Sequence, residues 1–234
     1  MKHKITALSF SGWSQNPDSL EIIFRNSDCN IELKSFDYSR FDNIENFYFQ
    51  IQKLSFIPNL VIGWSLGGQL AIRLIERKII NPEFLVLIGT PFQFVKSSQI
   101  AAAMPKTAYE NFKGKFSKAP DETLKKFSIL TMMNDKNSRE LFENLTITSE
   151  NHKNLIFWLE ELGRFSCHEI DFSSFPKTLI IHGAGDIVVH PSQAEVFAKK
   201  IPHAILKIIT NCGHAPHYNN ADELQKIIQQ HLTP

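Results

Sequence analysis

The stretch "VIGWSLGGQLAIRLI", from Val61 to Ile75, decides the fold of this chain of 234 residues. An apolar run typical of a buried strand leads into Gly63-Trp64-Ser65-Leu66-Gly67, and apolar residues at helical spacing follow. This is the G-x-S-x-G pattern in the context that gives it meaning, a sharp turn from a strand into a helix. Small neighbours permit so tight a turn, which lifts Ser65 clear of the sheet at a helix N-terminus.

A serine hydroxyl is a weak nucleophile that needs a base to take its proton and a carboxylate to orient that base. Where a serine stands on such a turn, the acid follows it in the chain and the histidine comes last. Asp186 lies just past the strand-like run "TLIIHG", and His214 lies just past the last strand-like run. Because the carboxyl ends of parallel strands meet at one edge of a sheet, we expect Ser65, Asp186 and His214 to form a catalytic triad.

The same chemistry requires two hydrogen-bond donors for the oxyanion that forms on the substrate. The amide of Leu66, directly after the serine, is one candidate. The amide of Trp13, in the loop "SFSGWS" after the first strand-like run, is the other.

Each of these assignments has a structural alternative. A G-x-S-x-G pattern alone occurs by chance, and His214 taken alone could be a surface histidine, as could His217 close by. His182 ends a strand and favours a packed or supporting role. Asp171 precedes its strand and Asp222 lies in the final helical pattern, so both rank below Asp186 as the acid.

Strand-like and helix-like patterns alternate along most of the chain, which predicts an α/β fold with a mostly parallel sheet of about six strands. The expected strands are Lys4–Phe10, Ile31–Phe36, Asn59–Gly63, Phe84–Gly89, Thr178–Gly183 and Ala204–Thr210. The expected helices of this part are Leu66–Lys78, Ser192–Lys200 and Asn220–His231.

The alternation stops between Pro91 and about Phe165, where helical patterns alone occur. We therefore expect a core formed by residues 1–90 and 166–234, with an all-helical lid inserted at residues 91–165. The expected lid helices are Gln99–Phe116, Asp121–Met133, Asn137–Leu145 and His152–Leu162.

Composition narrows the function further. A net charge of +1 without a basic, aromatic-rich stripe argues against a nucleic-acid partner. Cys29, Cys167 and Cys212 are too scattered for a zinc site or a disulfide framework, and the proposed chemistry needs no cofactor. No apolar run approaches the length of a membrane span. We expect a monomeric, cytoplasmic protein without a membrane partner.

The motifs resemble those of the α/β-hydrolase family, and more narrowly of the pimeloyl-[acyl-carrier-protein] methyl ester carboxylesterases of biotin synthesis (BioH type). "GWSLGG" is identical to that family's nucleophile turn, while Gly12-Trp13 and His214-Ala215-Pro216 match its oxyanion loop and histidine motif. A departure is Ser11, where the family usually has histidine. The resemblance implies hydrolysis of the methyl ester of pimeloyl-acyl carrier protein through an acyl-enzyme on Ser65.

The expected lid carries the residues that would contact substrate and partner. Nine basic and four acidic residues between Pro91 and Arg139 give +5, a local field that favours an acidic partner such as acyl carrier protein. The alternative is that these lysines simply solvate a helical surface. The candidate partner contacts are Lys113, Lys115, Lys125, Lys126 and Arg139. Trp13 and Trp64 beside the serine, with Phe112 and Phe116 by resemblance, are the candidate substrate contacts.

Two other functions stay open. One is a general carboxylesterase or thioesterase that acts on small acyl esters without a carrier. The other is a ligand-binding protein with a hydrolase-like fold and little turnover.

Overall fold

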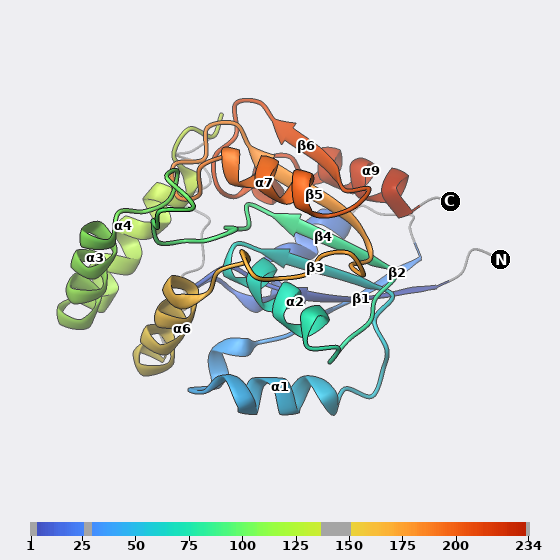
Figure 1. Ribbon diagram of the computed structural model, residues 1–234, viewed down its shortest axis with the longest axis horizontal. Helices are drawn as coiled ribbons and strands as arrows, with labels where there is room; N and C mark the ends of the chain where they lie inside the picture. Colours follow the sequence, from blue (N-terminus) through green and yellow to red (C-terminus); the bar gives the residue numbers. More distant parts are fainter. Residues whose placement is uncertain (1–3, 26–29, 137–150, 233–234) are drawn as a thin grey trace.

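The computed structural model describes residues 4–25, 30–136 and 151–232. Six parallel strands form one sheet in the order β2-β1-β3-β4-β5-β6 (Figure 1). The strands are β1 (Ile5–Phe10), β2 (Ile31–Ser35), β3 (Leu60–Trp64), β4 (Phe84–Ile88), β5 (Lys177–Gly183) and β6 (Ile205–Ile209). All six expected strands are therefore present, with their ends within one residue of the predicted bounds.

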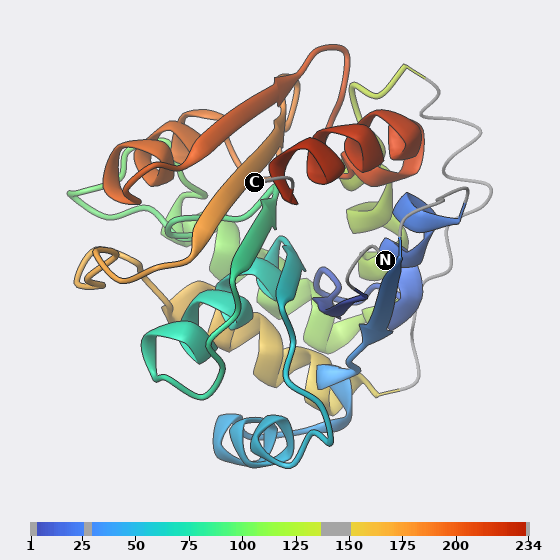
Figure 2. The same ribbon diagram turned by 90° about the vertical axis from the view of Figure 1, so that its right-hand side faces the viewer.

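The central strands are buried on both faces because their alternate side chains enter two separate apolar clusters. Val61 of β3 joins one cluster, while its neighbours Leu60 and Ile62 join the other. The first face is covered by α1 (Ile44–Gln52), α2 (Leu66–Glu76) and α7 (Ser192–Lys200). The second face is covered by η1 (Pro17–Phe24) and α9 (Ala221–Leu232), and Figure 2 shows these two layers on either side of the sheet.

Two short elements complete this core. The 3-10 helix η2 (Tyr38–Arg40) follows β2, and α8 (Pro216–Asn219) leads into α9. Within the described ranges, no helix combines the length and the apolar character needed to cross a bilayer.

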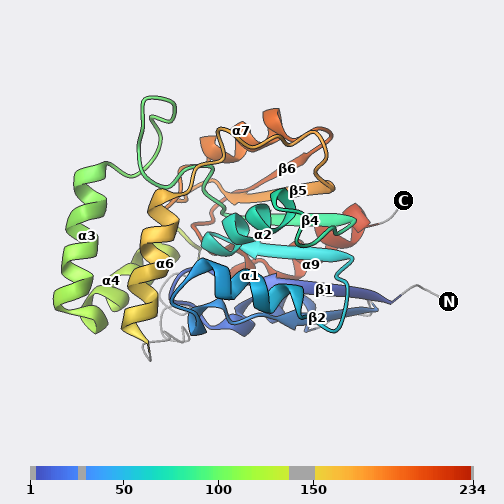
Figure 3. The same cartoon turned by 60° about the horizontal axis from the view of Figure 1, so that its bottom comes forward.

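Among the residues that the structure describes between β4 and β5, there are three helices: α3 (Lys106–Lys118), α4 (Pro120–Met132) and α6 (His152–Arg164). They gather beyond the carboxyl ends of the strands, at the left of Figures 1 and 3. The expected helix Gln99–Phe116 is wrong at its start, because helix begins only after Pro105, whose extended backbone ends the preceding loop. The expected helix Asn137–Leu145 lies outside the described residues.

The helical segment is bonded to the core at several points. Glu161 of α6 accepts hydrogen bonds from Arg73 of α2 through both its carboxylate and its carbonyl. The indole Nε1 of Trp13 donates to the Leu155 carbonyl of α6 over 2.7 Å. These contacts hold α6 against the carboxyl edge of the sheet, where the candidate residues lie.

Candidate active site

Ser65 occupies the turn between β3 and α2 with φ 54° and ψ −118°. A residue with a Cβ adopts this region at a cost of about 1–3 kcal/mol, so the surrounding structure must impose it. The Ser65 amide donates to the Ile88 carbonyl at the end of β4 over 2.9 Å, and the Ser65 carbonyl accepts from the Gly68 amide over 3.0 Å. The turn is thus fixed by both neighbouring elements.

The glycines of the motif are required by close backbone approach. A Cβ on Gly63 would lie 2.5 Å from the Gly67 carbonyl oxygen, and a Cβ on Gly67 would overlap the Phe10 carbonyl of β1. Because these obstacles are backbone atoms, a side chain at either position would force β3, α2 and β1 apart.

The structure brings Ser65, His214 and Asp186 together. His214 Nε2 lies 2.9 Å from Ser65 Oγ, and His214 Nδ1 lies 2.7 Å from Asp186 Oδ2. One tautomer satisfies both contacts, because Nδ1–H donates to the carboxylate while Nε2 accepts from the serine hydroxyl. All three residues are buried, with at most 4% of their surface exposed. This geometry suits transfer of the serine proton to the imidazole.

Asp186 is held as an ionised acid. Its Oδ1 accepts from the amides of Val188 and Val189 at 2.8 and 2.9 Å, and His182 Nε2 lies 3.0 Å from its Oδ2. Burial alone would raise the pKa of Asp186, but the charge of His214 and hydrogen bonds from both histidines lower it well below its ordinary range. His182 therefore supports the acid, in the role that its place at a strand end suggested.

His214 is fixed from two further sides. The indole Nε1 of Trp64 donates to the His214 carbonyl over 2.9 Å. Gly89 follows β4 with φ 52°, and a Cβ there would lie 3.2 Å from His214 Nδ1. Glycine at position 89 therefore leaves the space that the imidazole of His214 occupies. The sequence pattern did not reveal this constraint.

The two candidate oxyanion donors lie in well-braced segments. Leu66 is the first residue of α2, and the loop carrying Trp13 is held by a hydrogen bond of 2.7 Å from Tyr38 Oη to the Gly12 carbonyl. Among the described loops and caps, neither the Trp13 amide nor the Leu66 amide donates a hydrogen bond to another backbone group. Both amides are thus available as donors, and their role as an oxyanion hole stays a prediction.

The aromatic candidates divide into two places. The Trp13 ring meets Phe112 and Phe116 of α3 edge to face, with centroids 5.7 and 5.2 Å apart. Phe127 of α4, which sequence reasoning missed, completes this group at 5.3 Å from Trp13. Trp64 instead lies in the cluster on the α9 side of the sheet, with no exposed surface.

Two of the candidate partner lysines, Lys113 and Lys126, already form ion pairs with acidic side chains. Lys113 Nζ lies 3.4 Å from carboxylate oxygens of both Glu110 and Glu160. Lys126 pairs with Glu122 over 2.6 Å at an exposed i,i+4 position. These two lysines are already matched by acids of the same helical segment.

Lys115 and Lys125 are exposed, and Arg139 lies outside the described residues. The charge of +5 counted over residues 91–139 does not extend to the whole expected lid. Residues 91–165 contain 11 Lys and Arg and 9 Asp and Glu, a net charge of +2. The positive field is therefore concentrated on the part of the segment that includes α3 and α4.

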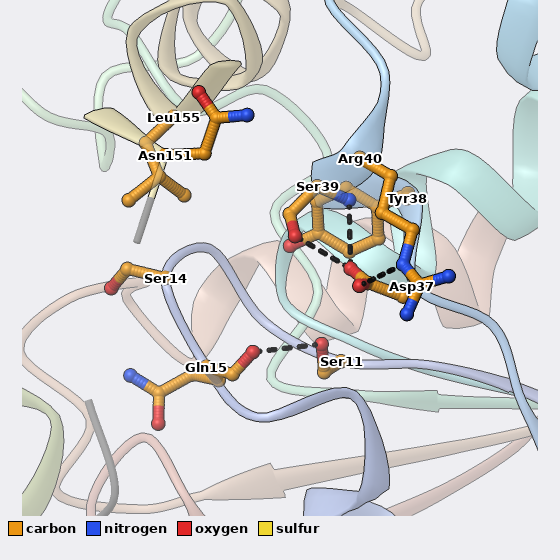
Figure 4. Close-up of a pocket in the computed structure, with 9 residues that line it drawn as sticks. All are labelled: Ser11, Ser14, Gln15, Asp37, Tyr38, Ser39, Arg40, Asn151 and Leu155. Atoms are coloured by element: carbon orange, nitrogen blue, oxygen red, sulfur yellow. Dashed lines mark hydrogen bonds and ion pairs between the residues drawn. The ribbon is translucent and has the colours of Figure 1, made fainter. Parts of the chain in front are cut away.

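A pocket of about 270 Å³ opens beside the loop that carries Trp13 (Figure 4). It is lined by Ser11, Ser14, Gln15, Asp37, Tyr38, Ser39, Arg40, Asn151 and Leu155. Most of its lining residues are polar. The pocket borders the loop that carries Trp13, and none of Ser65, Asp186 and His214 is among its lining residues.

The competing candidates lie elsewhere. Asp171 and Asp222 are exposed, and His217 is fully buried against the Trp64 ring. Burial raises the pKa of the Cys212 thiol far above its ordinary value, so this cysteine is not a nucleophile at neutral pH. Within the described ranges, no group of three or more histidine, cysteine or acidic side chains is placed to hold a metal ion.

Comparison with known proteins agrees with this architecture. A sequence profile of the alpha/beta hydrolase fold matches residues 7–221. An esterase from Exiguobacterium antarcticum has a similar structure, with a TM-score of 0.84 at 18% identity, covering 97% of this chain and 91% of that one.

Two relatives are closer in sequence. The biotin biosynthesis bifunctional protein BioHC of Teredinibacter turnerae is 28% identical over 235 residues, which cover 92% of this chain but 40% of the relative. The pimeloyl-[acyl-carrier protein] methyl ester esterase of Aromatoleum aromaticum is 30% identical over 180 residues, covering 73% of this chain and 72% of the relative. The chain therefore belongs to the α/β-hydrolase family, in the branch of ester hydrolases that includes the pimeloyl-[acyl-carrier protein] methyl ester esterases.

Proposed function

We propose that this protein is a serine esterase that hydrolyses the methyl ester of pimeloyl-acyl carrier protein in biotin synthesis. The observation that carries the proposal is the hydrogen-bonded chain from Ser65 Oγ through His214 to Asp186. The relatives named pimeloyl-[acyl-carrier protein] methyl ester esterase support the choice of substrate.

The first half of the reaction forms an acyl-enzyme. Ser65 Oγ attacks the ester carbonyl carbon while His214 Nε2 takes the hydroxyl proton, and Asp186 stabilises the resulting imidazolium. The amides of Trp13 and Leu66 donate to the oxyanion of the tetrahedral intermediate. Collapse of this intermediate breaks the bond to the methoxy oxygen, which takes the proton from His214 and leaves as methanol.

The second half restores the enzyme. His214 removes a proton from water, and the hydroxide attacks the acyl carbon on Ser65. Collapse breaks the bond to Ser65 Oγ, which takes the proton back from His214, and the free carboxylic acid leaves. Each step uses side chains and backbone amides of this chain alone.

The catalytic assignment is tested by comparing the wild-type protein with Ser65→Ala. We expect the substitution to lower the rate on p-nitrophenyl butyrate by roughly 10⁴- to 10⁶-fold and to abolish labelling by a fluorophosphonate probe. A wild-type protein that neither turns over esters nor takes the label would instead favour the ligand-binding alternative.

The biological substrate is tested by complementation. In a biotin auxotroph that lacks its methyl esterase, the wild-type gene should restore growth without biotin, and the Ser65→Ala gene should not. Failure to restore growth despite robust cleavage of p-nitrophenyl butyrate would favour a general esterase.

We also propose that the carrier protein docks beside α3 and α4, where Lys115 and Lys125 are exposed. Acyl carrier proteins are acidic, so these charges would speed encounter. The double change Lys115→Ala with Lys125→Ala should lower kcat/KM on the carrier-bound ester several-fold and spare p-nitrophenyl butyrate. Lys199→Ala, an exposed lysine of α7, is the control, and equal effects on both substrates would contradict carrier docking.

A further inference from the structure

The C-terminal end of α4 and the turn after it, residues 131–135, contact the two loops that carry the acid and the histidine of the proposed triad. The His214 amide donates to the Thr131 carbonyl over 3.2 Å. The side-chain amide of Asn134 donates through Nδ2 to the Gly185 carbonyl over 2.8 Å. Gly185 directly precedes Asp186. The same short segment therefore bonds to the backbone of His214 and to the residue before Asp186.

The α4 terminal turn, the Gly185 loop and the Gly213 loop are closely packed against one another. A Cβ on Gly213 would overlap the Met133 carbonyl, and a Cβ on Gly185 would lie 2.9 Å from the Cβ of Asn134. The two loops are also joined directly, because the Gly185 amide donates to the Cys212 carbonyl over 2.8 Å. A shift of the turn is therefore transmitted to both loops.

Asn134 has a backbone conformation suited to this contact. Its φ of 68° lies in the left-handed region, which asparagine adopts more readily than other residues with a Cβ. Glycine would adopt the same backbone at no steric cost, but it has no amide to donate. Asn134 therefore adopts the left-handed backbone that the turn needs and also donates a side-chain hydrogen bond, which glycine could not do.

The same helix reaches the oxyanion side of the site. Phe127, one helical turn before Thr131, packs edge to face on the Trp13 ring at 5.3 Å between centroids. α4 and its terminal turn therefore contact all three loops of the site: the Trp13 loop, the loop of the acid and the loop of the histidine.

We propose that Asn134 is a positioning residue for the proposed ester hydrolysis. Its side-chain amide fixes the loop that presents Asp186 to His214, so that α4 joins the oxyanion loop and the triad into one rigid unit. This inference rests on the proposed function, because it concerns the efficiency of the same reaction.

The variant Asn134→Gly tests the inference because it keeps the left-handed backbone and deletes the donor. We expect kcat on p-nitrophenyl butyrate to fall roughly ten-fold with little change in KM, since small displacements of catalytic groups carry large penalties. We also expect the acidic limb of the kcat/KM profile to move to lower pH. Moving the Asp186 carboxylate away from the imidazole removes part of the electrostatic stabilisation of the imidazolium that forms in the reaction.

Lys78→Gly is the matched control. Lys78 also has a left-handed backbone, with φ 56°, and it is exposed just past the end of α2. This change should leave both kcat and the pH profile at their wild-type values.

Three outcomes would be decisive against the inference or its premise. If Asn134→Gly matches the wild-type rate and pH profile while Ser65→Ala is inactive, the inference fails and the proposed function stands. Asn134→Gly could also lose the same fraction of activity at every pH and unfold at a lower urea concentration than the wild type. The residue would then be merely structural, and the inference would again be overturned. If Ser65→Ala retains full activity, the proposed function itself fails.

Discussion

At the scale of single residues, the site depends on backbone conformations that its neighbours enforce. Ser65 keeps its left-handed φ because its amide is bonded to β4 and because glycines on both sides let α2 and β1 approach. The strain is local, whereas the contacts that sustain it come from three elements. The motif is consequently sensitive to any added side-chain atom.

We predict that Gly63→Ala destabilises the protein by several kcal/mol, because its Cβ would meet backbone atoms of α2 that have no freedom to move away. Gly114→Ala is the control: Gly114 lies in α3 with no atom within 4 Å of an added Cβ, so the change should stabilise by about 0.5–1 kcal/mol. Urea denaturation measures both free energies of unfolding. Equal stabilities for the two variants would contradict the steric explanation.

His217 provides a second prediction at this scale, through pH. The residue is fully buried, and its ring centroid lies 4.4 Å from that of Trp64. Within the part of the chain that the structure describes, neither ring nitrogen has a hydrogen-bond partner. Burial, followed by the charge of His214, lowers the pKa of His217 to about 3. An unfolded histidine has a pKa of about 6.5, so between these values the unfolded state binds the extra proton and stability falls as the pH falls.

Replacing this ring by His217→Phe should flatten the acid side of the stability curve. Between about pH 6 and pH 4, the slope of unfolding free energy against pH should decrease by up to about 1.4 kcal/mol per pH unit, the contribution of one proton. Urea denaturation at several pH values gives the two slopes. Parallel curves for wild type and variant would show that His217 does not titrate as described.

At the scale of elements, α2 and α6 are joined by a buried ion pair. Arg73 and Glu161 have side chains that are 7% and 9% exposed, and the Arg73 guanidinium also lies 4.1 Å from the ring centroid of Phe165. Removing one partner of such a pair leaves the other charge buried without compensation. The Arg73–Glu161 pair therefore helps to fix the position of α6 against α2.

Glu161→Ala should destabilise the protein by about 3–5 kcal/mol, because the Arg73 guanidinium would stay buried and unpaired. Glu122→Ala is the matched control, since it removes an exposed i,i+4 pair with Lys126 and should cost at most about 0.5 kcal/mol. Thermal and urea denaturation compare the two. A small effect of Glu161→Ala would mean that water replaces the lost carboxylate.

At the scale of the whole molecule, the site exists because the strand order places distant residues at one edge. Ser65 follows β3 and His214 follows β6, 149 positions later in the chain, and their contact depends on β3, β4, β5 and β6 lying side by side in the sheet. The described residues of the expected lid, among them Phe116 and Trp158, belong to the same large apolar cluster as residues of the core. We infer that the lid folds together with the core.

Loss of fluorophosphonate labelling at Ser65 should therefore coincide with global unfolding in urea, as one cooperative transition. Near-ultraviolet circular dichroism and the yield of labelled protein, measured on the same samples, would test this. Labelling that disappears well before the dichroism would show instead that the helical segment opens separately.

The sequence by itself determined the elements and the order of the chemical groups. Strand periodicity, the glycine-flanked turn and the positions of Asp186 and His214 after strands are local patterns, and local patterns are readable without coordinates. The same reasoning misplaced the start of α3, because a helical apolar pattern continued through residues that Pro105 separates from the helix.

Apart from His182, the groups that support the site were decided by the tertiary structure alone. The bond from Tyr38 to the Gly12 carbonyl, the fit of Gly89 beneath His214 and the contact of Asn134 with the Gly185 loop join segments far apart in the chain. Such contacts depend on packing distances of a few ångströms, and no periodicity records them. A sequence pattern can therefore identify the reacting groups, whereas their alignment is fixed by contacts that exist only once the chain is folded.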